Sequence, residues 1–106
     1  MASPVPSEHC LQAWLHCEVL LGQVNSGAHS FSLRTRRVLN ECSELCLGTH
    51  EALRAGLGST GEFALLCVGI CVECAEVCAR YSGSSFRYCA DACMACAEAL
   101  AAIADV

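Results

Sequence analysis

Apolar residues recur along most of this chain at spacings of three and four, the spacing that keeps side chains on one face of an α-helix. Stretches rich in glycine and serine interrupt the pattern at 27–30, 56–61 and 81–85. The intervening segments predict helices at about 7–25, 30–56, 60–81 and 84–104. Because the connections are short, the expected fold is an all-α, antiparallel, up-and-down four-helix bundle. A chain of 106 residues suits one domain of this kind.

Two features predict where helices begin. Pro4 and Pro6 precede the first helix, where proline does not interrupt it, and Ser7 is the expected N-cap residue. Ser59 and Glu62 have the three-residue spacing of a capping box at the start of the third helix. Both signals agree with the limits that the apolar pattern sets.

Cysteine makes up 11 of the 106 residues, a level typical of disulfide scaffolds and of thiolate metal sites. Within each predicted helix the cysteines are three, four or seven residues apart, so they share one helix face. Apolar residues continue these faces: Trp14, Leu21, Val24, Leu39, Leu53, Ala64, Phe86, Leu100 and Ile103. We therefore expect every thiol to point into the bundle core: Cys10, Cys17, Cys42, Cys46, Cys67, Cys71, Cys74, Cys78, Cys89, Cys93 and Cys96.

Packing and disulfide formation explain so many inward thiols poorly. Cysteine can fill a core as a small apolar residue, but packing alone gives no reason to use it eleven times. Cβ atoms at i and i+4 of a helix lie about 5–6 Å apart, whereas a disulfide needs about 3.8 Å. The first residues, MASPVPSEHC, do not have the pattern of an export signal, so we expect a cytosolic protein whose thiols stay reduced.

Metal binding is the remaining interpretation. An iron–sulfur electron carrier needs the ferredoxin spacing, but Cys71, Cys74 and Cys78 lack its second two-residue step. Zinc needs four ligands in a tetrahedron, whereas the Cys-x2-Cys pairs here lie on helices without a knuckle. Cu(I) is soft, accepts two or three thiolates, and can be spanned by two thiolates one helical turn apart. Cu(I) binding is therefore the leading hypothesis. The iron–sulfur carrier and a zinc or other soft-metal thiolate protein remain as alternatives.

The strings CVGICVECAEVC at 67–78 and CADACMACAEA at 89–99 resemble the bacterial copper storage proteins, and NECSELC at 40–46 and SEHC at 7–10 also fit. The resemblance covers nearly the whole chain. It implies a cytosolic four-helix bundle that holds several Cu(I) ions through inward thiolates and assembles as a homotetramer. The richest members have more cysteines, at positions that this chain fills with Trp14, Leu21, Thr35, Ala64, Phe86 and Leu100. We therefore expect a lower copper capacity.

His50 follows Cys46 by four residues, so it is a candidate metal ligand at the mouth of the thiol column. No catalytic pair is recognisable, since neighbours such as His16 and Cys17 diverge by about 100° around a helix. We therefore expect a binding protein and not an enzyme, with a copper chaperone or a small thiol as donor or acceptor. The net charge of −5 and the short longest apolar run, 63–72, predict neither a nucleic-acid partner nor a membrane span.

Depth along the bundle follows from a rise of about 1.5 Å per residue. If the four helices are flush at their ends, one layer contains a thiol from each of them: Cys17, Cys46, Cys71 and Cys93. The neighbouring layers contain Cys42, Cys74 and Cys89 on one side and Cys67 and Cys96 on the other. Copper ions should therefore lie along the bundle axis and not in one cluster.

The two ends of this column are expected to differ. Cys10 and His50 lie at one end, which is a candidate entrance for copper. Cys78 lies alone at the other end, where the expected capping residues are Val24, Leu39 and Phe86. The third helix is also apolar on its flanks, through Leu65, Leu66, Val68, Ile70 and Val72. One bundle cannot bury all of these side chains, so we expect a homo-oligomer.

Overall fold

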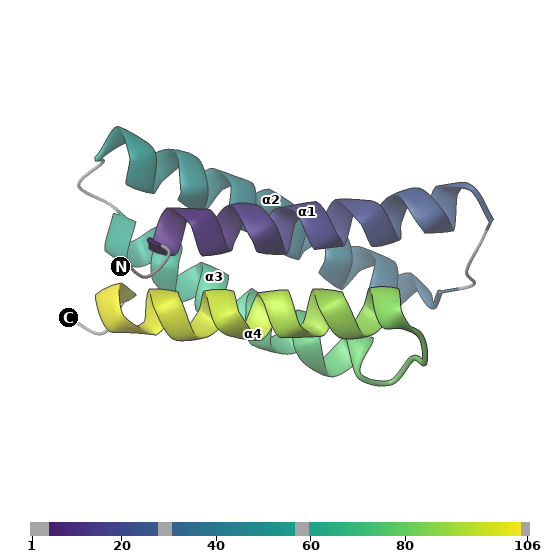
Figure 1. The fold of residues 1–106 in the computed structure, drawn as a ribbon. Coiled ribbons are helices and arrows are strands. Elements are labelled where there is room, and N and C mark those ends of the chain that lie inside the picture. Colours follow the sequence, from purple (N-terminus) through teal and green to yellow (C-terminus); the bar gives the residue numbers. More distant parts are fainter. Residues whose placement is uncertain (1–4, 28–30, 57–59, 105–106) are drawn as a thin grey trace.

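The computed structural model describes residues 5–27, 31–56 and 60–104. Over these ranges the chain forms four α-helices and no strand: α1 (Pro6–Asn25), α2 (Leu33–Ala55), α3 (Thr60–Cys78) and α4 (Ser84–Ala104). Successive helices run antiparallel, and α4 returns alongside α1 (Figure 1). The predicted up-and-down four-helix bundle is therefore confirmed.

The start of α1 differs from the prediction. Val5 is the N-cap residue and has no side-chain capping bond, and Pro6 occupies the first turn. Proline suits this position because the backbone N–H that it lacks has no acceptor within the helix. Ser7 therefore lies inside the first turn, where it is buried, and the prediction of an N-cap at Ser7 is wrong. The predicted capping box includes Ser59, which lies outside the described residues.

Local hydrogen bonds and one glycine set the limits of α2. Ser32 caps its start, because the Ser32 Oγ accepts a hydrogen bond of 3.1 Å from the backbone N–H of Thr35. Gly56 ends the helix with a φ of 68°, a left-handed conformation that glycine adopts without strain. The helix therefore begins at Leu33, a little later than the sequence predicts.

α3 ends earlier than predicted, at Cys78 instead of residue 81. The backbone N–H groups of Arg80 and Tyr81 bond to the carbonyls of Val77 and Cys78, each three residues back, so the chain tightens into a turn. Cys78 is consequently the last helical residue of α3. No further turn of that helix lies beyond its thiol.

The buried face of α1 differs by one position from the predicted one. The sequence predicts Trp14 and Leu21 as inward residues, but both are only partly buried. Ala13 and Leu20 are fully buried in their place, because each lies three residues from a cysteine of α1 and continues the thiol face. Trp14 and Leu21 lie one position to the side of that face.

Most other predicted core positions are confirmed. Leu53 and Ile103 are only partly buried, at the end of the bundle where α2 and α4 finish. The remaining predicted inward residues are buried: Val24, Thr35, Leu39, Ala64, Phe86 and Leu100. Among the described helices, none is long and apolar enough to cross a bilayer.

The helices are not flush along the bundle axis. The C-terminal end of α2 extends beyond the start of α1, and the C-terminal end of α1 extends beyond the start of α2 (Figure 1). α1 is thus displaced along its neighbours toward the α1–α2 connection. This displacement affects which thiols meet in the core.

Candidate metal centre

The cysteines form the centre of the core. All eleven lie within the described ranges, and all are buried as free thiols without a disulfide. The prediction that every thiol points inward is therefore confirmed. The spacing of three and four residues makes this a local property of each helix, because it returns each thiol to the same face.

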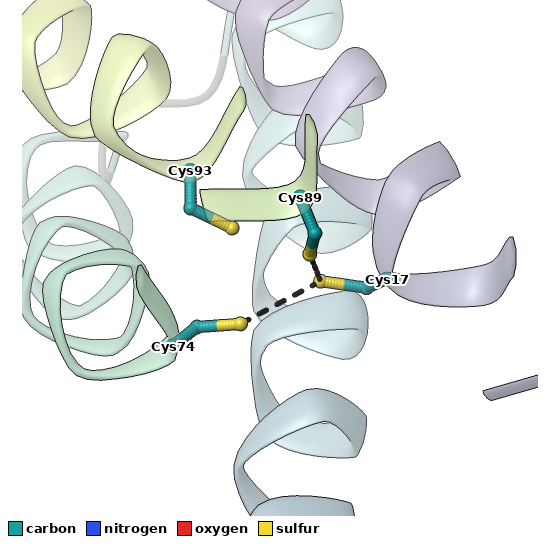
Figure 2. A group of neighbouring side chains, drawn as sticks. All are labelled: Cys17, Cys74, Cys89 and Cys93. Carbon is teal, nitrogen blue, oxygen red and sulfur yellow. Dashed lines mark hydrogen bonds between the residues drawn. The ribbon is translucent and has the colours of Figure 1, made fainter. Parts of the chain in front are cut away.

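One group of thiols joins α1, α3 and α4. The Sγ atoms of Cys17, Cys74, Cys89 and Cys93 all lie within 4.8 Å of one another. The Cys17 Sγ is 3.9 Å from the Cys74 Sγ and 3.8 Å from the Cys89 Sγ. Figure 2 shows these sulfur atoms turned toward one another from three helices. The group has enough soft ligands to hold a metal ion.

A second group joins α2, α3 and α4. It consists of Cys46, Cys67, Cys71 and Cys96, whose Sγ atoms also lie within 4.8 Å of one another. The Cys46 Sγ is 3.6 Å from the Sγ atoms of both Cys67 and Cys71. No member of this group belongs to the group around Cys17.

A third group links the first two. Cys42 lies 4.0 Å from Cys71 and 3.8 Å from Cys93, measured between Sγ atoms. Cys71 belongs to the group around Cys46, and Cys93 belongs to the group around Cys17. Cys10 extends the series, because its Sγ is 3.7 Å from the Cys96 Sγ. Ten of the eleven thiols therefore form a continuous column through the core, and Cys78 lies one turn beyond Cys74 on α3.

The register between α3 and α4 agrees with the sequence prediction. The predicted partners share groups: Cys67 with Cys96, Cys71 with Cys93, and Cys74 with Cys89. These two helices are joined by the short connection at 79–83, which brings their ends together. When residues are counted from that connection, the rise per residue therefore gives the correct position of each thiol along the bundle axis on both helices.

The predicted register of α1 and α2 is correct only in part, because α1 and α2 are displaced along the bundle axis. Cys17 and Cys46 do not share a layer, because they belong to different groups. Cys17 meets Cys74 and Cys89, and Cys42 meets the layer of Cys71 and Cys93. Each displacement is smaller than about one helical turn, because Cys17 still shares a group with its predicted partner Cys93 and Cys46 with Cys71, and the two displacements are opposite in direction. The physical reason is the axial stagger of α1 against α2, which a rise per residue within one helix does not reveal.

The spacing of the sulfur atoms suits shared metal ions. The closest Sγ–Sγ distances in the column are 3.6 to 4.0 Å, and all Sγ atoms within one group lie within 4.8 Å of one another. Two metal–sulfur bonds of about 2.3 Å that meet at a trigonal angle separate their sulfur atoms by about 4.0 Å. The thiols are therefore positioned so that one ion can bridge neighbours within a helix or between helices after a small adjustment.

The pKa of eight of the eleven thiols lies above its ordinary value, so these thiols stay neutral when no metal is bound, whereas hydrogen bonds from neighbouring thiols lower the pKa of Cys67, Cys74 and Cys93. Hydrogen bonding with Cys42 and Cys67, together with burial, raises the pKa of the Cys46 thiol above its ordinary value. Cys67, Cys96 and burial raise the pKa of the Cys10 thiol in the same way. The permanently charged basic side chains are all arginines at exposed positions, so none of them offsets a buried thiolate. A bound cation has to replace thiol protons.

His50 is not brought into any of the three thiol groups. Its ring is partly buried, and Nδ1 lies 2.8 Å from the backbone carbonyl oxygen of Ser7. Because a carbonyl oxygen only accepts hydrogen bonds, Nδ1 carries the proton and donates it. The ring therefore ties α2 to the first turn of α1, and metal ligation by His50 stays a prediction.

A cavity beside Cys78 was not recognisable from the sequence. It has a volume of about 490 Å³ and includes the α3–α4 turn in its lining. Its charged lining residues, Arg87 and Asp91, follow no metal-ligand or catalytic spacing. The only sequence signal for this cavity was the four-residue spacing of these two charged residues on α4. Oppositely charged residues at that spacing are common on any solvent-exposed helix face, so the spacing did not indicate a cavity.

Comparison with known proteins places the column in a family. No curated protein and no solved structure matches this chain. The family model described as "Copper storage protein" matches residues 5–105. The match includes all eleven cysteines and all four helices, and it agrees with a column of buried thiols that can hold metal ions. The chain therefore belongs to the copper storage protein family.

Proposed function

We propose that this protein stores or sequesters several Cu(I) ions in the cytosol through the cysteine thiolates of its core. The observation that carries the proposal is the core of eleven buried thiols, ten of which are linked in one column whose closest Sγ atoms are 3.6–4.0 Å apart. The family match supports copper as the metal. All eleven cysteines are proposed as ligands, and His50 is proposed as a weaker candidate at one end.

The preferred number of ligands favours Cu(I) over zinc. Cu(I) binds two or three thiolates, so ions at neighbouring positions can share residues such as Cys71 and Cys93, each of which belongs to two groups. Zinc prefers four ligands, and the two groups of four thiols would supply two tetrahedral sites. Zinc would then leave Cys10, Cys42 and Cys78 unused. The number of bound ions therefore separates the two metals.

The iron–sulfur alternative fits the column less well. The thiol sulfurs already touch one another at 3.6–4.0 Å, which leaves room for single bridging ions. A cluster with its own sulfide atoms needs additional space between the ligands. The alternative predicts a brown protein, whereas Cu(I) thiolates are colourless because the ion has a filled d shell. A colourless copper-loaded protein is the result that we expect.

The proposed role is binding and not catalysis, with exchange of copper through a chaperone or a small thiol. We also propose assembly as a homotetramer. Support for an assembly comes from α3, where Leu65 and Leu66 are 63% and 60% exposed. Ile70 is buried and Val68 and Val72 are partly buried, so Leu65 and Leu66 form the apolar flank of α3 that an assembly would cover.

Anaerobic titration of the reduced protein with Cu(I) against a competing chelator tests the proposal. We expect more ions per chain than the two that zinc would occupy, without visible colour. The same titration with Zn(II) is the control for metal preference. Binding of one Cu(I) ion or none per chain would reject the storage function.

A further inference from the structure

The thiol column is closed at the end near Cys10. On each helix, a buried side chain lies one turn beyond the last thiol at this end: Ser7, Thr49, Ala64 and Leu100. Three of these, Thr49, Ala64 and Leu100, have no exposed surface. The thiols at this end are therefore separated from solvent by a complete layer of side chains.

The opposite end has the same closure on three helices but not on α3. Leu20, Leu39 and Phe86 lie one turn beyond the last thiols of α1, α2 and α4, and all are buried. α3 ends at Cys78 itself, so no residue of that helix follows to cover the thiol. Among the eleven described thiols, Cys78 is the one with measurable exposure, at 1%.

A cavity of about 490 Å³ has Cys78 in its lining, together with residues of the α3–α4 turn and the α4 residues Arg87 and Asp91. Arg87 and Asp91 bring opposite charges to the same cavity, one turn apart on α4. Within the described part of the chain, neither of them is in an ion pair, since the one pair found there joins Arg34 to Glu73.

We propose that this cavity binds a zwitterionic low-molecular-weight thiol of the amino-acid or short-peptide class that carries Cu(I), and that copper enters and leaves the column through Cys78. The inference rests on the proposed copper storage function. The carrier's carboxylate pairs with Arg87, its ammonium group pairs with Asp91, and its metal-bound sulfur faces Cys78. The cavity volume lies in the range of sites for small molecules, which is about 300–1,000 Å³.

Transfer takes place by ligand exchange at the metal. Cu(I) arrives bound by two carrier thiolates, and the Cys78 Sγ forms a new copper–sulfur bond as one carrier bond breaks. The Cys78 proton passes to the departing carrier sulfur, and copper remains in the +1 state. A second exchange with Cys74, one turn back along α3, releases the second carrier molecule in the same way. The Cys74 Sγ contacts the Cys17 Sγ, so copper bound at Cys74 is next to the first group of the thiol column.

Uptake kinetics of single-thiol variants test the role of Cys78. We would mix the reduced protein anaerobically with glutathione-bound Cu(I) and follow copper–thiolate absorbance in the ultraviolet. Cys78→Ala should slow the initial uptake about tenfold, because the remaining thiols become accessible only when a helix end opens. Cys10→Ala is the matched comparison, because it also removes one proposed ligand but at the closed end, and it should slow the initial uptake much less than Cys78→Ala. Equal rates for Cys78→Ala and the wild type would overturn the proposal.

Charge variants test the carrier. Arg87→Gln should raise the glutathione–Cu(I) concentration needed for half-maximal rate by about fivefold, the upper range for an exposed ion pair. With Cu(I) bound to uncharged 2-mercaptoethanol, the same variant should behave as the wild type. Arg36→Gln removes the same charge at the same end of the bundle but does not line the cavity, and it should change neither reaction. Equal effects of Arg87→Gln and Arg36→Gln would overturn the proposed binding site.

The outcomes separate this inference from the storage function. If the wild type takes up no more than one Cu(I) ion, the storage function fails, and the inference fails with it. If the wild type fills with copper but the Cys78 and Arg87 variants behave as their controls, only the inference fails. Arg87 is exposed, so its variant should fold even if Cys78→Ala does not, and it then decides the matter alone.

Discussion

Two neighbouring parts of the core are held together by different interactions. In the thiol column, Sγ atoms touch at 3.6–4.0 Å, and thiols are weak donors and weak acceptors. At the end of the bundle near α2's first turn, the rings of Phe31, Tyr81 and Phe86 pack with centroids 4.7–5.5 Å apart. The Tyr81 hydroxyl also forms a 2.9 Å hydrogen bond with Thr35 Oγ1.

This difference separates stability from metal binding. Aromatic side chains bury a large area and pair in preferred geometries, so the aromatic cluster (Phe31, Tyr81 and Phe86) stabilises the chain without metal. The thiol column gains its strongest interactions only when a metal ion replaces its protons. Changes in the aromatic cluster should therefore affect folding first, and changes in the column should affect copper binding first.

Copper loading should have the largest effect. Apolar and aromatic residues outside the column supply enough core for the metal-free protein to stay helical. Loading should then raise the free energy of unfolding by more than about 4 kcal/mol, the value for a single site at a thousandfold excess over its Kd. Circular dichroism during urea unfolding, with and without Cu(I), measures the helicity of the metal-free protein and the increase in the free energy of unfolding. A random-coil spectrum of the reduced metal-free protein would contradict the separation of stability from binding.

Removal of an aromatic ring should have the next largest effect. Phe86→Ala should lower the free energy of unfolding of the metal-free protein by about 3–5 kcal/mol, because it leaves a cavity in the aromatic cluster. The copper bound per folded chain should not change. Tyr88→Ala, on the same helix but 58% exposed, is the control. A lower copper content in the folded Phe86→Ala protein would mean that the two regions are not independent.

Single thiols should affect copper content unequally. Cys71 belongs to two of the groups of thiols and Cys10 to none of them, so Cys71→Ala should lose more copper per chain than Cys10→Ala. Each change should cost about 1 kcal/mol of metal-free stability, as expected for removal of one small buried group. Copper per chain after gel filtration, measured by atomic absorption, tests this. Equal losses would show that copper is not shared at Cys71.

The hydrogen bond of the aromatic cluster should have the smallest effect. Tyr81→Phe keeps the ring but removes the bond to Thr35, and it should destabilise the metal-free protein by about 1 kcal/mol. Copper binding should be unchanged. Tyr88→Phe is the matched control because its hydroxyl lies on an exposed side chain. If urea unfolding gives the same midpoint for both variants, the hydrogen bond does not contribute to stability.

The sequence by itself determined the helices and the direction of the thiols. Spacings of three and four residues are a property of a single helix, so the inward position of all eleven cysteines followed without knowledge of the neighbours. The register of α3 against α4 also followed, because the connection at 79–83 is too short to allow a large offset. Helix periodicity and the short connections were enough to predict the fold class.

The tertiary structure alone decided how the helices are displaced along one another. The axial offset of α1 against α2 depends on packing and on the path of the connection between them, so the meeting of Cys17 with Cys74 and Cys89 was not predictable. Small shifts within the first turn of α1 likewise moved Ser7 from the expected cap into the helix. The cavity beside Cys78 exists because α3 stops there, where hydrogen bonds three residues back replace the helical pattern. Local periodicity gives the face on which a side chain lies, whereas offsets between helices arise from contacts between residues far apart in the chain.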